Sequence, residues 1–116
     1  MLDTWVNRPW GRYKTVWESK TKKIKILEVF YGKRLSLQYH NHRTEQWSLI
    51  QGEAVINLNG MNLTLNMGER VNIGKQAIHR ISNRGPMPVV ILEIQEGKCR
   101  ERDIIRLEDD YGRVLE

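Results

Sequence analysis

Short runs of alternating apolar and polar residues, each closed by glycine, asparagine or proline, restrict the possible folds of this chain more than any other feature. Asn59-Gly60 is the clearest turn signal, because both residues tolerate the positive φ that a two-residue hairpin requires. Strands are predicted at 22–30, 34–40, 46–50, 53–58, 61–67, 71–73, 78–82 and 89–95. No amphipathic helical pattern separates them, so the sequence predicts an all-β barrel or sandwich.

The length of 116 residues fits one domain, with an N-terminal arm at about 1–20 and a C-terminal tail at about 100–116. The single cysteine, Cys99, excludes an intramolecular disulfide and suits a reducing compartment. The first residues lack the apolar core of a secretory signal, and no apolar run approaches the roughly 20 residues of a membrane helix. We therefore expect a cytoplasmic protein without a membrane partner.

The formal net charge of +5 is compatible with a nucleic acid or with small phosphorylated ligands. The basic residues are spread along the chain, however, and no nucleic-acid-binding motif is present. A solvated surface is the simpler interpretation, so we expect no nucleic-acid partner.

Histidine and glutamate side chains fall where strand alternation brings them to common faces. Gln38, His40 and His42 share one face if their strand continues through all three. Glu45 belongs to the next strand, and His79 begins a later one. Imidazole and carboxylate groups are good ligands for Mn, Fe, Co, Ni or Zn. A His-x-His pair alone is more often a surface feature, but all three histidines here lie within one frame of spaced glycines.

This spacing resembles the first of the two cupin motifs: glycine, five residues, a ligand, one residue, a ligand, three or four residues, glutamate, six residues, glycine. The matching positions are Gly32, Gln38, His40, Glu45 and Gly52, with Gln38 in place of the usual histidine. An alternative frame pairs His40 with His42, but it fits the spacing less well. We prefer the first frame, which leaves His42 free for ligand binding or proton transfer.

The second cupin motif is matched by Gly68, His79 and Asn83, whereas Gly74 and Gln76 replace its proline and second glycine. The resemblance implies a jelly-roll barrel, the double-stranded β-helix, that holds one divalent ion such as Zn, Mn, Co or Ni. The implied metal ligands are Gln38, His40, Glu45 and His79.

A narrower resemblance, to type II mannose-6-phosphate isomerases, covers some nine-tenths of the chain. It is carried by the segments 8–11, 34–47, 79–83 and 106–113. In that family the cupin unit is often joined to a mannose-1-phosphate guanylyltransferase. Here it stands alone, and Gln46 replaces a histidine that the family usually has. The resemblance implies interconversion of mannose 6-phosphate and fructose 6-phosphate through an enediol, with the metal polarising the substrate oxygens.

Catalytic roles follow from the resemblance and from side-chain chemistry. His42 is the expected base, because imidazole titrates near neutral pH, although a metal-binding or supporting role is nearly as well founded. Arg43 is the second expected catalytic residue.

The expected phosphate-binding residues are Arg34, Arg43 and Arg80, because the arginine fork matches phosphate geometry. Alternation turns Arg80 away from the ligand face, so a surface role is equally expected for it. Lys33 and Arg113 are weaker candidates, and Trp47 is expected to wall the site beside Glu45.

Two other functions compete with the isomerase. The first is a non-catalytic module that binds a sugar or sugar nucleotide and acts with a separate nucleotidyltransferase; Gln46 and the missing transferase favour it. The second is another cupin enzyme, an epimerase or a dioxygenase. In each case we expect a homodimer, since small open barrels have strand edges to protect.

Overall fold

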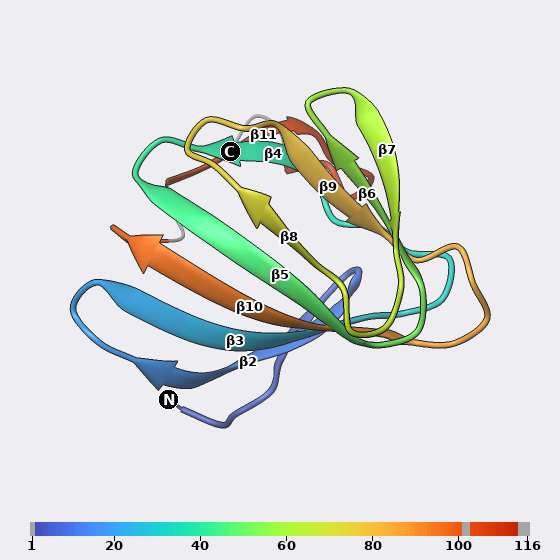
Figure 1. Ribbon diagram of the computed structural model, residues 1–116, viewed down its shortest axis with the longest axis horizontal. Helices are drawn as coiled ribbons and strands as arrows, with labels where there is room; N and C mark the ends of the chain where they lie inside the picture. The colour runs from blue at the N-terminus through green and yellow to red at the C-terminus, as the bar shows by residue number, and fades with distance from the viewer. Residues whose placement is uncertain (1, 101–102, 114–116) are drawn as a thin grey trace.

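A computed structural model describes residues 2–100 and 103–113, and this part of the chain forms strands without an α-helix (Figure 1). The strands are β1 (Val6–Arg8), β2 (Gly11–Glu18), β3 (Lys22–Val29), β4 (Leu37–His40), β5 (Arg43–Gln51), β6 (Ala54–Leu58), β7 (Met61–Leu65), β8 (Arg70–Ile73), β9 (His79–Ser82), β10 (Val89–Gly97) and β11 (Ile104–Glu108). Of the expected arm and tail, residues 1, 101–102 and 114–116 lie outside the described residues. The described chain has no helix long and apolar enough to cross a membrane.

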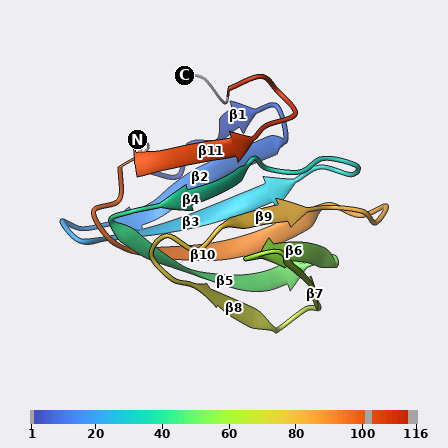
Figure 2. The same cartoon turned by 90° about the horizontal axis from the view of Figure 1, so that it is seen from above.

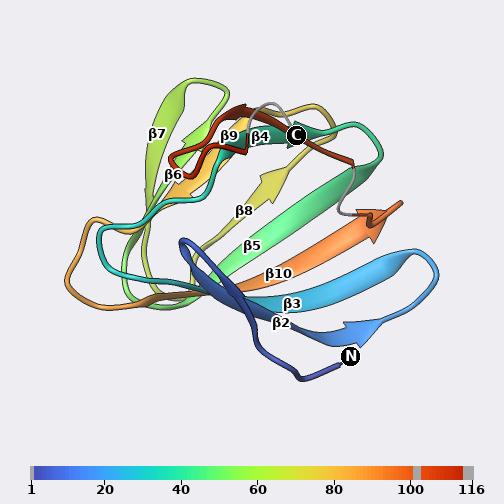
Figure 3. The same cartoon turned by 180° about the vertical axis from the view of Figure 1, so that it is seen from behind.

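The strands form two antiparallel sheets that face each other. One has the order β1-β2-β3-β10-β5-β8 and the other β11-β4-β9-β6-β7. Figure 1 shows the first sheet in its lower half and the second above it, and Figures 2 and 3 show the same two layers from above and behind. The predicted all-β architecture is confirmed.

The predicted hairpin at Asn59-Gly60 is confirmed. It joins β6 to β7, and the φ angles of its two residues are 50° and 85°. Two positive φ values are the mark of a type I′ turn, whose twist matches that of the flanking strands.

The arm and the tail both contribute strands. In the arm, β2 pairs with nearly the whole of β3, although its sequence GRYKTVWE gave no clear strand signal. Its central residues are all only half-buried, so apolar and polar positions do not alternate clearly. In the tail, β11 pairs with β4 at the edge of the second sheet.

The space between the sheets is apolar at one end and polar at the other. On β5 the inward side chains run from Leu49 and Trp47 to Glu45 and Arg43. The neighbouring strands show the same change: Leu27 to Lys25 on β3, and Ile91 to Glu93 and Gln95 on β10. Strand register aligns these positions, since Lys25 and Trp47 both face Glu93, and Glu45 faces Gln95. Pairing therefore gathers the polar residues at one end of the barrel.

Gly97 allows the end of β10 to approach the turn before β5. Its φ is 117°, and an added Cβ would lie 2.4 Å from the His42 carbonyl oxygen. Gly97→Ala is therefore expected to lower the free energy of unfolding by about 1–3 kcal/mol, measured by urea denaturation. Gly74→Ala is the matched control, because a Cβ there meets nothing within 4 Å. Equal stabilities of the two variants would contradict this account of the close approach.

Candidate functional site

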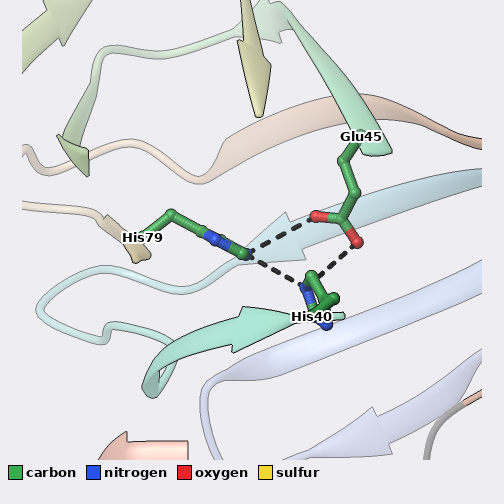
Figure 4. Close-up of side chains that lie close together, drawn as sticks. All are labelled: His40, Glu45 and His79. Carbon is green, nitrogen blue, oxygen red and sulfur yellow. Dashed lines mark hydrogen bonds and ion pairs between the residues drawn. The ribbon is translucent and has the colours of Figure 1, made fainter. Parts of the chain in front are cut away.

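Three side chains from three strands converge at the polar end of the barrel. His40 ends β4, Glu45 lies on β5 and His79 begins β9, and Figure 4 shows all three pointing toward one another. The His40 and His79 Nε2 atoms are 3.1 Å apart. Glu45 places Oε2 3.3 Å from His40 Nε2 and Oε1 3.6 Å from His79 Nε2. All three side chains are buried.

Hydrogen bonding fixes the His79 ring in the form that a metal ion requires. Its Nδ1 lies 2.8 Å from the Ala77 carbonyl oxygen, which can only accept, so Nδ1 carries the proton and donates it. The Nε2 lone pair then points toward His40 and Glu45. Glu45 Oε1 is buried and accepts no hydrogen bond from the residues that the structure describes. An imidazole lone pair and an unsatisfied carboxylate oxygen thus face the same point.

The protonation states at neutral pH also suit a cation. Burial alone would raise the pKa of Glu45, but the hydrogen bond to His40 and the charge of Arg43 outweigh it and lower the pKa to about 2. Burial lowers the pKa of His79 to about 4, against the opposing charge of Glu45. Glu45 is therefore ionised and His79 neutral, which are the forms that bind metal ions.

The donor separations fit a single ion. Donors bound at about 2.1 Å lie about 3–3.5 Å apart around a tetrahedral or octahedral centre. The two imidazole nitrogens are 3.1 Å apart, and they lie 3.3 and 3.6 Å from the two different oxygens of Glu45. Gln38 adjoins the group, with Nε2 3.4 Å from His40 Nε2, while its Oε1 accepts a hydrogen bond from Ser36. Rotation of the Gln38 amide by half a turn would place its oxygen, instead of its nitrogen, next to His40. The four predicted ligands therefore lie together, and coordination by them stays a prediction.

Arg43 forms a buried ion pair with the same glutamate. Its Nε and Nη2 each lie 2.9 Å from Glu45 Oε2, and Nη2 is also 3.4 Å from His40 Nε2. The side chain is only 3% exposed. The guanidinium thus provides the positive charge that balances the buried carboxylate.

A cavity of about 60 Å³ lies between the sheets next to this group. We call it the inter-sheet cavity. Five cationic side chains contribute to its lining: Arg8, Lys25, Arg43, Arg106 and Arg113. Glu93 is the acidic residue of the lining, and Glu45 and Asp109 form ion pairs with Arg43 and Arg113. Cationic residues still outnumber these three carboxylates.

Glu93 is held by neighbours on both sides. Its carboxylate accepts hydrogen bonds from Trp47 Nε1 at 2.9 Å and from Gln95 Nε2 at 2.7 Å. Burial, followed by the charge of Glu45, raises its pKa to about 7, although Lys25 opposes the shift.

Sequence reasoning missed Lys25, Glu93 and Gln95. A signal was present: each stands at an inward position of an otherwise apolar strand face, where a charged or amide side chain is unusual unless it has a partner.

The other predicted residues are distributed over the molecule. Trp47 is buried, with its ring centroid 5.2 Å from that of His79, so it does lie beside the site. Arg34 instead pairs with Asp110 at 2.7 and 2.8 Å. Arg80 donates to the Leu35 carbonyl and to Glu108. Neither of these two arginines lines the inter-sheet cavity, whereas Arg43 and the weaker candidate Arg113 do; Lys33 is exposed and does not.

His42 does not continue the face of His40. The strand β4 ends at His40, and the chain turns before β5, leaving the His42 side chain exposed. Its backbone N–H donates to Asp103 at 2.9 Å, and the residue borders a surface hollow with Lys98 and Arg100. Gln46, which replaces a histidine usual in the isomerase family, also faces outward and donates a hydrogen bond to Asn72. This replacement therefore does not lie among the buried ligand candidates.

Comparison with known proteins places these features in a family. Residues 2–109 match the family model described as mannose-6-phosphate isomerase C-terminal. The alginate biosynthesis protein AlgA of Pseudomonas aeruginosa is 39% identical over 96% of this chain and 23% of its own length. The mannose-1-phosphate guanylyltransferase ManC of Salmonella typhimurium is 36% identical over 94% of this chain and 23% of its own. The chain thus spans about a quarter of the length of these relatives.

Solved structures confirm the predicted cupin fold. The capsular polysaccharide assembling protein CapF of Staphylococcus aureus superposes with a TM-score of 0.81 at 16% identity, over 90% of this chain and 34% of that protein. A Klebsiella pneumoniae protein with a double-stranded β-helix domain gives a TM-score of 0.69 at 22% identity, over 74% of this chain and 76% of its own.

These comparisons correct the prediction that the chain is a mannose-6-phosphate isomerase. Its similarity is to the C-terminal cupin part of much longer proteins, two of which carry the names of a guanylyltransferase and a polysaccharide biosynthesis protein. A single cupin part fits a non-catalytic binding module better than a complete isomerase. The geometry agrees with the correction, because the expected base, His42, is exposed at the surface, whereas His40, Glu45 and His79 are buried.

Proposed function

The chain belongs to the mannose-6-phosphate isomerase C-terminal family, and from this we propose that it is a non-catalytic cupin module that binds a phosphorylated sugar or a sugar nucleotide. The observation that carries the proposal is the inter-sheet cavity, which is lined by five cationic side chains. One of them, Arg43, also contacts His40 and Glu45. An anion entering this space exchanges part of its hydration for contacts with fixed positive charges.

The cavity suits the phosphate end of such a ligand. About 10–15 Å³ of such space admits one water molecule, so about 60 Å³ accommodates a few water-sized groups such as phosphate oxygens. Four of the five cationic residues are arginines, whose planar forks bind phosphate through paired hydrogen bonds. Phosphorylated sugars therefore fit this lining better than neutral sugars.

The proposal includes one divalent ion, with Zn, Mn, Co and Ni as the candidates, on His40, Glu45, His79 and Gln38. The donor separations and the unsatisfied oxygen of Glu45 support it. A bound ion supplies Lewis-acid contacts to sugar hydroxyl oxygens.

Two protein partners are proposed. A separate nucleotidyltransferase is suggested by the relatives, which are about four times as long as this chain and include a mannose-1-phosphate guanylyltransferase. A homodimer is suggested by the edge strand β7, on which Met61 and Leu63 are exposed apolar side chains. The cytoplasmic location stays a prediction.

Calorimetric titration tests the proposed function directly. Mannose 1-phosphate, mannose 6-phosphate and GDP-mannose are titrated into the protein, with unphosphorylated mannose as the ligand control. At least one phosphorylated ligand is expected to bind and mannose is not. Arg106→Gln is expected to weaken that binding about tenfold, because it removes a charged donor from the cavity.

The matched control is Arg12→Gln. It removes the same charge from an arginine that pairs with Glu28 away from the cavity, so it should leave the affinity unchanged. Equal loss of binding in both variants would show that net charge, and not the cavity, attracts the ligand. Production of fructose 6-phosphate from mannose 6-phosphate would contradict the non-catalytic role.

A further inference from the structure

Arg43 belongs to two sites at once. Its guanidinium holds Glu45 Oε2 through two contacts of 2.9 Å and reaches to 3.4 Å from His40 Nε2. The same residue lines the inter-sheet cavity with four other cationic side chains. Arg43 is thus a cationic residue of the cavity lining that also contacts two of the candidate metal ligands.

A divalent ion and Arg43 compete for the same carboxylate. A divalent ion held by His40, Glu45 and His79 shares the negative charge of Glu45 with Arg43. It also places two more positive charges beside the guanidinium. Burial strengthens the resulting repulsion, since neither charge is screened by water. With the cavity empty, Arg43 therefore opposes metal binding.

An anion in the cavity removes this opposition. Its oxygens give the guanidinium acceptors other than Glu45, and its negative charge offsets that of Arg43. The charge of Arg43 then opposes the ion less, and the charge of the ion in turn attracts the anion. The free energies of the two binding events are thus linked through one side chain.

We propose that Arg43 couples the two sites, so that an anion in the inter-sheet cavity and a divalent ion on His40, Glu45 and His79 each strengthen binding of the other. The coupling rests on the proposed function and specifies how its two ligands depend on each other. Thermodynamic linkage requires the same factor in both directions. A factor of about ten lies within the usual range for such coupling.

The experiment is calorimetric titration of Co²⁺ into the metal-free chain in sodium sulfate and in sodium chloride of equal ionic strength. Sulfate is the probe because it is a tetrahedral dianion that resembles phosphate. Co²⁺ is expected to bind about tenfold more tightly in sulfate. Sulfate is expected to bind the Co²⁺-loaded chain tighter than the metal-free chain by the same factor.

Arg43→Gln tests the assignment to this residue. The variant should bind Co²⁺ with equal affinity in the two salts, whereas Arg12→Gln should retain the full difference because Arg12 pairs with Glu28 elsewhere. Circular dichroism checks that Arg43→Gln folds. If it does not, Arg43→Lys, which keeps the charge without the fork, takes its place and should retain only part of the difference.

Three outcomes separate the coupling from the proposed function. Equal Co²⁺ affinity in both salts for the wild-type chain, with sugar-phosphate binding intact, overturns the coupling alone. A full sulfate effect in folded Arg43→Gln overturns the assignment to Arg43. Absence of both Co²⁺ and sugar-phosphate binding overturns the proposed function and the coupling together.

Discussion

Glu45→Gln is expected to lower the free energy of unfolding of the metal-free chain by about 3–5 kcal/mol, because it leaves Arg43 charged and buried without a counter-ion. Both side chains are almost completely inaccessible to water, and two guanidinium nitrogens lie within 2.9 Å of one carboxylate oxygen. Neighbouring His40 and His79 cannot replace the lost negative charge.

Urea denaturation in the presence of a chelator measures this effect without a contribution from bound metal. Glu28→Gln is the matched control, because it removes the partner of Arg12 from a partly exposed pair and should lower stability by only about 0–1 kcal/mol. The double variant Arg43→Gln/Glu45→Gln should be more stable than Glu45→Gln, since it leaves neither charge unpaired. A double variant less stable than Glu45→Gln would show that the cost does not arise from the unpaired arginine.

Glu45 also makes the free energy of unfolding fall in acid. Its pKa is lowered to about 2 in the folded chain from an ordinary value of 4.5. The unfolded chain therefore takes up the proton first as the pH falls. The stabilising contribution of Glu45 is complete above about pH 4.5 and is lost as the pH falls toward 2.

Glu93 is expected to make stability depend on pH in the opposite direction to Glu45, and Glu93→Gln should remove this dependence. Burial, and next the charge of Glu45, raise the pKa of Glu93 from 4.5 to about 7. As the pH rises from 4.5, the unfolded chain releases this proton first, so the folded wild-type chain loses stability until the pH passes about 7. A shift of this size corresponds to about 3 kcal/mol.

The measurement is the difference in free energy of unfolding between wild type and Glu93→Gln at pH 5 and at pH 8. The variant should gain about 2.5 kcal/mol on the wild type between these two values, because part of the effect is already present at pH 5. His79, with its pKa lowered to about 4, destabilises both proteins as the pH falls below 6.5, so its effect cancels in the difference. A difference that stays constant with pH would show that Glu93 is ionised at both values.

Local sequence patterns were sufficient for the strands that alternate clearly. The hairpin at Asn59-Gly60 formed where predicted because two residues that accept positive φ lie between complementary strands. The strand β2 was missed because its side chains are half-buried and its polar residues interrupt the apolar pattern. In this case pairing with β3, and not local preference, stabilises the strand.

The candidate site shows the same division. Alternation within one strand placed Gln38 next to His40, and the cupin spacing added Glu45 and His79. Alternation failed at His42 because β4 ends at His40, and no short-range rule fixed where the chain would turn.

The sequence by itself determined the all-β class, the main hairpin and the identity of the three converging donors. Tertiary structure alone decided that Arg43 holds Glu45, and that Lys25 and Glu93 meet at one end of the barrel. The physical reason is that alternation is local, repeating every two residues along one strand. Register between strands and the facing of two sheets depend instead on residues far apart in the chain.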